Sequence, residues 1–251
     1  MKPAVKRLLF YGGLILFWWL GSHFELWHQT ILPSPISVWE SLAAGFADMT
    51  LVYDLVASFR RLFIGLVVSI LIGTALGILL ARSKTADETI GSMVLALQSV
   101  PSIIWLPLAM MWFGLGEGAI IFVVILGGTF VMTLNVRTGI KNVNPLFIKA
   151  ARTMGSNGID LFWKVIIPAS VPYLVTGARL AWAFAWRALM AGELLSAGPG
   201  LGYTLRYASD FGNMSLVIGV MIIIGVVGAV VDQLIFQRIE KNVLKRWGLE
   251  A

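Results

Sequence analysis

The chain has 251 residues, of which 58% are hydrophobic and only 13% are charged, whereas a soluble domain carries about a quarter charged residues. Its formal net charge is +6. The Lys and Arg residues stand between apolar runs, so they fit the cytoplasmic loops of a membrane protein better than a nucleic-acid surface. The absence of cysteine excludes disulfides and thiolate metal sites. Apolar runs of roughly 17–25 residues, without the alternating segments of a membrane barrel, predict an all-α membrane protein.

The N-terminal region predicts one span followed by an external loop. An apolar run over about residues 8–24 follows the basic residues Lys2, Lys6 and Arg7. Because the run is long and no A-x-A-like cleavage site follows it, a retained span is favoured over a signal peptide. Residues 23–54 carry Asp, Glu and His but no Lys or Arg, which is typical of the external side. The chain is expected to be extended around Pro33 and Pro35 before a helix resumes.

A second span is expected over about residues 62–81. Small residues recur in it at every fourth position: Gly65, Ser69, Gly73, Gly77 and Ala81. Such a stripe lets helix backbones approach closely, either within the chain or at a dimer seam, and both interpretations stay open. Arg60 and Arg61 are placed just before this span, on the external side.

The third span, about residues 90–115, contains Pro101 and Pro107 as candidate helix breaks. They are either tolerated kinks or breaks in a helix beside a conduit, because the carbonyls freed by proline need partners in protein or in a wet cavity. The fourth span, about residues 119–136, carries no charge.

Residues 144–168 are neither an apolar span nor an ordinary polar linker. Asn144 and Pro145 predict the start of a helix, and Gly155 is placed to end it in a left-handed cap. A second short helix is expected to restart at Asn157, capped by that side chain, until Pro168 interrupts it. Basic residues around the segment place it in the cytoplasm. We interpret it as a docking surface for another protein; the alternative is an amphipathic stretch resting on the membrane.

The fifth span, about residues 171–195, holds three ionisable residues, which are costly at membrane depth. Arg179 is expected to snorkel to the cytoplasmic end. Arg187 lies deeper, and two interpretations stay open: a pathway group for an anion, or an ion pair with Glu193 of a second subunit or with Asp232. Arg187 and Glu193 point in different directions on one helix, so a direct pair between them is not expected.

The glycine-rich residues after Glu193 are too polar to span and are expected to form an external or re-entrant turn. A sixth span follows over about residues 214–231. Most of the 19 Lys and Arg residues then fall on one side, and only Arg60, Arg61 and Arg206 fall on the other. Both termini are therefore predicted to be cytoplasmic.

Catalytic and metal motifs are missing from the sequence. There is no phosphate-cradling G-x-x-x-x-G-K-[ST] and no H-E-x-x-H, so we expect no catalytic residue, no bound metal and no cofactor on this chain. We therefore expect a translocation pathway that is driven by a partner protein. The alternatives are a self-contained channel or secondary transporter, and a membrane enzyme. One membrane domain is expected over 1–251, with the first span and external loop in about 1–60, core helices in about 61–240 and a cytoplasmic loop in about 141–168.

The sequence KAARTMGSNGIDLFWKVIIP resembles the EAA loop of ABC-importer membrane subunits, written E-A-A-x-x-x-G-x9-I-x-L-P. Ala150, Ala151, Gly155 and Pro168 match it, and Val165 and Ile167 are conservative replacements. Lys149 stands where the pattern has glutamate. The resemblance implies an ATPase-coupling loop that comprises Lys149, Ala150, Ala151, Arg152, Gly155, Val165, Ile167 and Pro168.

Three further segments, ILPSPISVW, WLPLAMMWFGLGE and AGELLSAGPGLGYTL, resemble the nitrate/sulfonate/taurine permease branch. The resemblance implies a six-helix type I ABC importer permease in a bacterial inner membrane, without its own ATPase site. It also implies as partners a second permease copy, two ATPase subunits that hold ATP and Mg, an extracytoplasmic solute-binding protein and membrane lipid, with no nucleic acid. The implied solute is a small anion such as a sulfonate, taurine or nitrate. Related permeases for thiamine precursors or flavins give the alternative.

Overall fold

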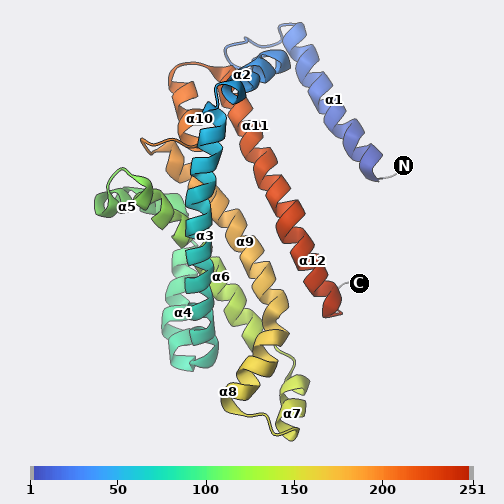
Figure 1. Ribbon diagram of the computed structural model, residues 1–251, viewed down its shortest axis with the longest axis vertical. Helices are drawn as coiled ribbons and strands as arrows, with labels where there is room; N and C mark the ends of the chain where they lie inside the picture. Colours follow the sequence, from blue (N-terminus) through green and yellow to red (C-terminus); the bar gives the residue numbers. More distant parts are fainter. Residues whose placement is uncertain (1–2, 249–251) are drawn as a thin grey trace. The chain divides into compact units, whose positions relative to one another are not determined.

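The computed structural model describes residues 3–248, and these form helices and connecting turns without a strand (Figure 1). The helices are α1 (Pro3–His23), α2 (Pro35–Ala47), α3 (Thr50–Arg82), α4 (Lys84–Gln98), η1 (Ser102–Trp105), α5 (Leu106–Phe113), α6 (Glu117–Lys141), α7 (Pro145–Thr153), α8 (Gly158–Leu161), η2 (Phe162–Ile166), α9 (Ile167–Leu194), α10 (Leu201–Asp210), α11 (Met214–Val231), η3 (Asp232–Phe236) and α12 (Gln237–Arg246). The predicted all-α class is confirmed. Lys2 lies outside the described residues.

The chain divides into two compact units. One comprises Met1–Ser58 and Pro199–Val226, and the other Phe59–Gly198 and Val227–Ala251. The second unit contains α4 to α9 and all the candidate site residues. The single permease domain stays a prediction.

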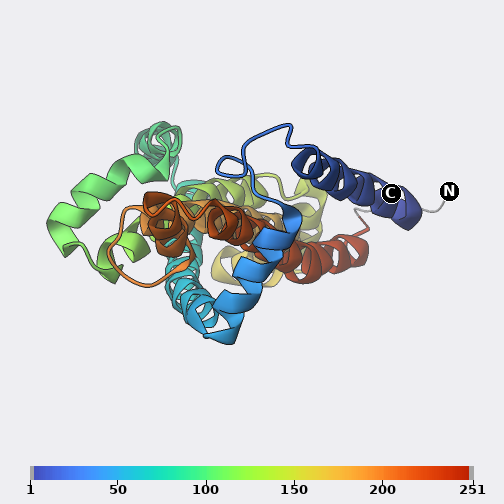
Figure 2. The ribbon, with the colours of Figure 1, turned by 90° about the horizontal axis from the view of Figure 1, so that it is seen from above.

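Four helices among the described residues are long and apolar enough to cross a membrane: Thr50–Arg82, Glu117–Lys141, Gly158–Leu194 and Met214–Arg246. The pair α4 and Ser102–Phe113, bent by 97°, gives a fifth if it counts as one span; Figures 1 and 2 show this bend. The apolar part of α1, Leu8–His23, is shorter and extends about 24 Å, less than the roughly 30 Å of a bilayer core. The predicted count of six spans is therefore not confirmed.

The small-residue stripe of α3 packs against α6 within the chain. A Cβ atom added to Gly73 would lie 2.8 Å from the carbonyl oxygen of Thr129, and one added to Gly77 would lie 2.7 Å from that of Thr133. Ser69, one turn before Gly73, is fully buried. Of the two interpretations of the stripe, the structure therefore supports intramolecular packing, because these positions are already filled by α6.

Helices α6 and α9 form the centre of the second unit and run side by side (Figure 1). Their backbones approach closely at glycines on both helices: an added Cβ at Gly139 would lie 2.5 Å from Tyr173 Cβ, and one at Gly177 would lie 2.7 Å from Asn135 Cβ. Buried apolar residues fill the contact: Val131, Met132, Val136 and Ala181. This tight pair is the scaffold that holds the charged side chains described below.

Pro168 does not interrupt the helix, contrary to the prediction. The helix from Gly158 continues through the π-helical turn η2 into α9, and Pro168 lies in the first turn of α9. A π-turn shifts the hydrogen-bond register of the backbone, and this accommodates a residue that has no amide hydrogen.

The glycine-rich segment after Glu193 was expected to be a turn, but most of it is the helix α10. The buried carboxylate of Asp54 accepts from the Gly200 amide at 2.9 Å and from the Thr204 hydroxyl, while Ser58 Oγ accepts from the Leu201 amide at 3.0 Å. A carboxylate at a helix N-terminus satisfies amides that lack partners in the helix. The prediction failed because this acceptor lies in a distant part of the sequence.

Candidate functional site

The first helix of the candidate docking hairpin, residues 144–168, has the caps that its sequence predicts. Asn144 accepts from the Leu146 amide at 2.9 Å, and Pro145 occupies the first helical position. Gly155 has a φ of +89°, and Ser156 donates to the carbonyl oxygen of Ala151 at 3.0 Å. This is the glycine-terminated C-cap of α7, and it reverses the chain toward α8.

The second helix begins differently from the prediction. Asn157 has extended backbone at the start of α8, but its side chain accepts no capping bond and instead donates to the Gly155 carbonyl at 3.4 Å. Asp160 in the first turn accepts from Lys164 at 2.7 Å, one helical turn later. The side-chain cap predicted for Asn157 is therefore wrong, because the turn uses that side chain to bridge back to the glycine.

The residues of the EAA-like motif lie on three successive elements. Lys149, Ala150, Ala151 and Arg152 are on α7, Val165 is on η2, and Ile167 and Pro168 are in the first turn of α9. Large apolar side chains are exposed around them: Leu146, Phe147, Met154, Ile159 and Trp163. Figure 1 shows α7 and α8 side by side at one end of the α6–α9 pair. Exposed apolar side chains of this kind are typical of a protein-binding surface or of a membrane contact, so both predicted roles of the hairpin stay open.

One contact joins this hairpin to the end of α3, and two ion pairs join the start of α4 to the end of α6. The Arg82 guanidinium lies over the Phe162 ring, 4.8 Å from its centroid. Asp87, near the start of α4, binds both Arg137 and Lys141 at the end of α6. The end of α3 is therefore attached to the hairpin itself, and the start of α4 is attached to α6, the helix that precedes the hairpin. Asp87 could not be recognised from local sequence, because its partners are 50 and 54 positions away.

Glu193 is fully buried and pairs with Arg61, whose side chain is only 1% exposed, at 2.8 Å. Arg61 also lies 3.0 Å from Glu117, which binds Arg60 as well. Arg60 and Arg61 thus lie inside the long helix α3, which begins at Thr50, and their place just before the membrane-spanning part of that helix stays a prediction. The sequence shows two arginines beside an apolar run. It does not show which helix faces them, so their carboxylate partners could not be predicted.

Arg179 binds two carboxylates that lie on a neighbouring part of the chain. Its guanidinium donates to both oxygens of Asp232, at 2.8 and 2.7 Å, and to Glu240 at 2.6 Å. Thr176, one turn earlier on α9, also donates to Glu240 at 2.7 Å. This cluster attaches α9 to η3 and α12, and the predicted position of Arg179 at the cytoplasmic end of its span stays a prediction.

Arg187 is exposed on α9, and its guanidinium lies 5.7 Å from the centroid of the Phe184 ring. Within residues 3–248, no carboxylate lies at salt-bridge distance from it: Asp232 binds Arg179, and Glu193 binds Arg61. The suggested pair with Asp232 is therefore wrong.

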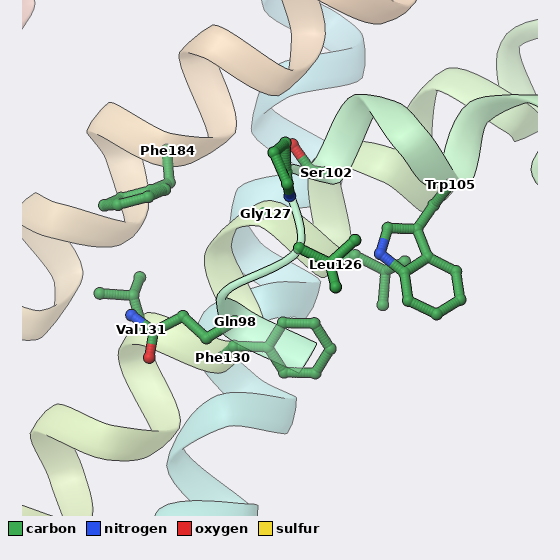
Figure 3. Close-up of a pocket in the computed structure, with 10 residues that line it drawn as sticks. Gln98, Ser102, Trp105, Leu126, Gly127, Phe130, Val131 and Phe184 are labelled. Atoms are coloured by element: carbon green, nitrogen blue, oxygen red, sulfur yellow. The ribbon is translucent and has the colours of Figure 1, made fainter. Parts of the chain in front are cut away.

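The bend between α4 and η1 borders a small cavity. Pro101 lies at the bend, and Pro107 lies in the first turn of α5, where no amide donor is needed. The cavity has a volume of about 60 Å³. Figure 3 shows its lining from the end of α4, from η1, from α6 and from α9: Gln98, Ser102, Trp105, Leu126, Gly127, Phe130, Val131 and Phe184.

A wider groove of about 420 Å³ is lined by α6, α9 and α12. Its walls combine apolar and polar side chains: Leu134, Asn135, Thr138, Pro172, Tyr173, Thr176 and Leu244. Among the residues that the structure covers, no three His, Asp or Glu side chains gather as a metal site.

The fold and these sites define an all-helical membrane protein of the multi-pass class, with a helical hairpin exposed at one end of its central helix pair. Residues 73–244 match the family described as "Binding-protein-dependent transport system inner membrane component", and the chain belongs to this family. It is a permease subunit of an ABC importer and has no ATPase site of its own.

Curated relatives agree with the family. The chain is 37% identical over 185 residues to a putative ABC transporter permease of Methanocaldococcus jannaschii, covering 73% of this chain and 69% of that protein. It is 30% identical over 224 residues to the taurine transport system permease of Escherichia coli K12, covering 87% and 82%. It is 31% identical over 188 residues to the nitrate import permease of Leptolyngbya laminosa, covering 75% and 67%.

The fold is that of a solved methionine ABC transporter, MetNI, in an inward-facing conformation. The TM-score is 0.68 at 22% identity, covering 77% of this chain and 96% of that one. The predicted type I importer permease fold is confirmed by this likeness.

Proposed function

We propose that this permease subunit lines the translocation pathway for a small anionic solute and couples to a separate ATPase through the 144–168 hairpin. The proposal includes a second permease copy and an extracytoplasmic solute-binding protein as partners. ATP and Mg would be held by the ATPase. The names of the relatives, which specify taurine, nitrate and aliphatic sulfonates, support an anion or a sulfonate-bearing solute.

Coupling would proceed through the contacts that surround the hairpin. When the ATPase moves α7, the Arg82–Phe162 contact and the Asp87 ion pairs would carry that movement to α3 and α4. α4 ends at the bend beside the small cavity, so a rigid-body tilt would change access to that region. The proposed mechanism is therefore alternating access, driven from the hairpin.

The proposal that the solute is an anion rests chiefly on one observation, the exposed side chain of Arg187. A cation at this depth of a membrane span is costly, and the described residues offer it an aromatic ring but no carboxylate. An anion in the pathway would supply the missing countercharge. Arg187 lies one turn of α9 beyond Phe184, which lines the small cavity.

The test is uptake of taurine, an alkanesulfonate and nitrate by the reconstituted importer with its binding protein. Arg187→Ala is expected to lower uptake about tenfold or more, the cost of one charged hydrogen bond, while Arg187→Lys keeps most of it. Arg238→Ala, which removes an exposed arginine of α12, is the matched control. Unchanged uptake by an intact Arg187→Ala complex would contradict the pathway role.

A second candidate, an importer of a neutral or aromatic organic solute such as a thiamine precursor or flavin, is favoured by the aromatic lining of the small cavity. Trp105, Phe130 and Phe184 all contribute to it. Ligand binding by the partner binding protein separates the two candidates, because that protein presents the solute.

A further inference from the structure

The small cavity at the bend between α4 and η1 contains a polar group that the fold leaves unpaired. The indole nitrogen of Trp105 is buried and has no hydrogen-bond partner among residues 3–248. Figure 3 shows this nitrogen on the edge of the ring that faces the other labelled residues of the lining. The nitrogen of a buried tryptophan usually finds an acceptor, so an unpaired one calls for an explanation.

The other polar side chains of the lining are also unpaired. Gln98 is the last residue of α4, and Ser102 is the first residue of η1. Neither side chain has a hydrogen-bond partner in the part of the chain that the structure describes. A carboxamide and a hydroxyl can donate or accept, whereas an indole can only donate. The lining therefore offers donors at three positions, and the indole requires an acceptor.

The charges around the cavity favour an anion over a cation. The ten described residues that line it include no Asp or Glu. Phe184 forms part of one wall, and the Arg187 guanidinium lies 5.7 Å from the centroid of that ring. A positive charge beside low-dielectric walls raises the local concentration of anions.

The size of the cavity limits the ligand further. Its volume is about 60 Å³, whereas one buried water needs roughly 10–15 Å³. The cavity therefore has room for a group of about four to six atoms of that size. A nitrate ion or a sulfonate group is of this size, whereas a ring system such as a flavin is larger.

Building on the proposed import of an anion, on which this step rests, we propose that the cavity is a transit site for the oxyanion group of the solute. The Trp105 indole donates to one of its oxygens, which supplies the acceptor that the fold does not. The Arg187 guanidinium offsets the negative charge from beyond the Phe184 ring. A hydrogen bond to an ionised acceptor is roughly twice as strong as a neutral one, so the site prefers an oxyanion to a neutral group of the same shape.

Fluorine NMR of the permease–ATPase complex in nanodiscs, labelled with fluorotryptophan, tests binding directly. The Trp105 resonance is the one that Trp105→Phe removes. Sodium nitrate and sodium methanesulfonate are expected to shift it, and sodium chloride at equal ionic strength and the neutral methanesulfonamide are expected to shift it less. The Trp112 resonance is the matched control and should not move, because Trp112 also lies on the bent arm but is 59% exposed and does not line the cavity.

Uptake by the reconstituted importer with its binding protein tests whether transport uses the site. Trp105→Phe keeps an aromatic ring but removes the donor. It is expected to lower the maximal rate of nitrate and alkanesulfonate uptake about tenfold, the effect of one hydrogen bond to a charged group. KM should stay unchanged, because the binding protein captures the solute. Trp112→Phe is expected to transport like the wild type.

A Trp105 resonance that neither oxyanion moves overturns the transit site, and a larger shift with methanesulfonamide than with methanesulfonate overturns its preference for anions. A shifted resonance with unchanged uptake by Trp105→Phe indicates an adventitious ion only and overturns the role in transport. In each case a wild-type importer that takes up these anions leaves the proposed function intact. A wild type that imports none of taurine, an alkanesulfonate and nitrate overturns the proposed function together with the transit site.

Discussion

At the scale of single residues, the buried pair of Arg61 and Glu193 is the most demanding feature of the chain. Both side chains have lost their water, and removing one leaves the other charge without compensation in a low-dielectric environment. Glu117 is the second acceptor for Arg61, so part of that compensation persists when Glu193 is removed. The pair holds α3 against the end of α9.

Glu193→Ala is therefore expected to lower the free energy of unfolding by about 3 kcal/mol, the low end of the range for breaking a buried ion pair. Thermal unfolding in detergent measures it. Glu88→Ala, which removes an exposed carboxylate paired with Lys84 within one helix, is the control and should change stability by no more than about 0.5 kcal/mol. Equal melting temperatures for the two variants would show that the buried pair contributes nothing to stability.

At the scale of elements, the hairpin depends on the backbone of one glycine. Gly155 has a φ of +89°, where a β-branched residue is strained, and no neighbouring atom restricts a side chain there. A substitution at Gly155 therefore tests the reversal of the chain and not its packing.

Gly155→Val is expected to strain the turn by about 1–3 kcal/mol and to displace α7 relative to α8. Solute-stimulated ATPase activity and uptake should fall together, while the melting temperature of the spans changes little. Gly155→Asn is the matched control, because asparagine tolerates the left-handed region. Normal coupling in the valine variant would mean that the reversal does not position the docking helix.

At the scale of the whole molecule, a permease subunit functions as part of an assembly. Closed two-fold assemblies are the commonest symmetric oligomers, and the family resemblance implies a homodimer. Native mass spectrometry of the purified complex is expected to find two copies of this chain and two ATPase subunits. A complex containing one copy of this chain and a different permease would establish a heterodimer.

The class of protein, the main spans and the first helix of the hairpin could all be predicted from local patterns in the chain. Apolar runs of span length leave a chain few alternatives in a membrane, because each backbone polar group must be paired within a helix. Asn144, Pro145 and Gly155 act over three or four residues, so their effect on α7 was readable from local sequence.

The partners of the charged side chains depend on how the helices pack against one another, which local patterns do not show. Helical periodicity fixes the directions in which Arg179 and Arg187 point, but it does not identify the helix that faces them. Asp232 was therefore a possible partner of Arg187 on sequence grounds, whereas in the structure it binds Arg179. For the same reason, the small-residue stripe of α3 is compatible by sequence with either intramolecular packing or a dimer seam. In the structure α6 packs against it. Asp54 caps α10 from about 150 positions away in the sequence, so no local pattern predicts this contact.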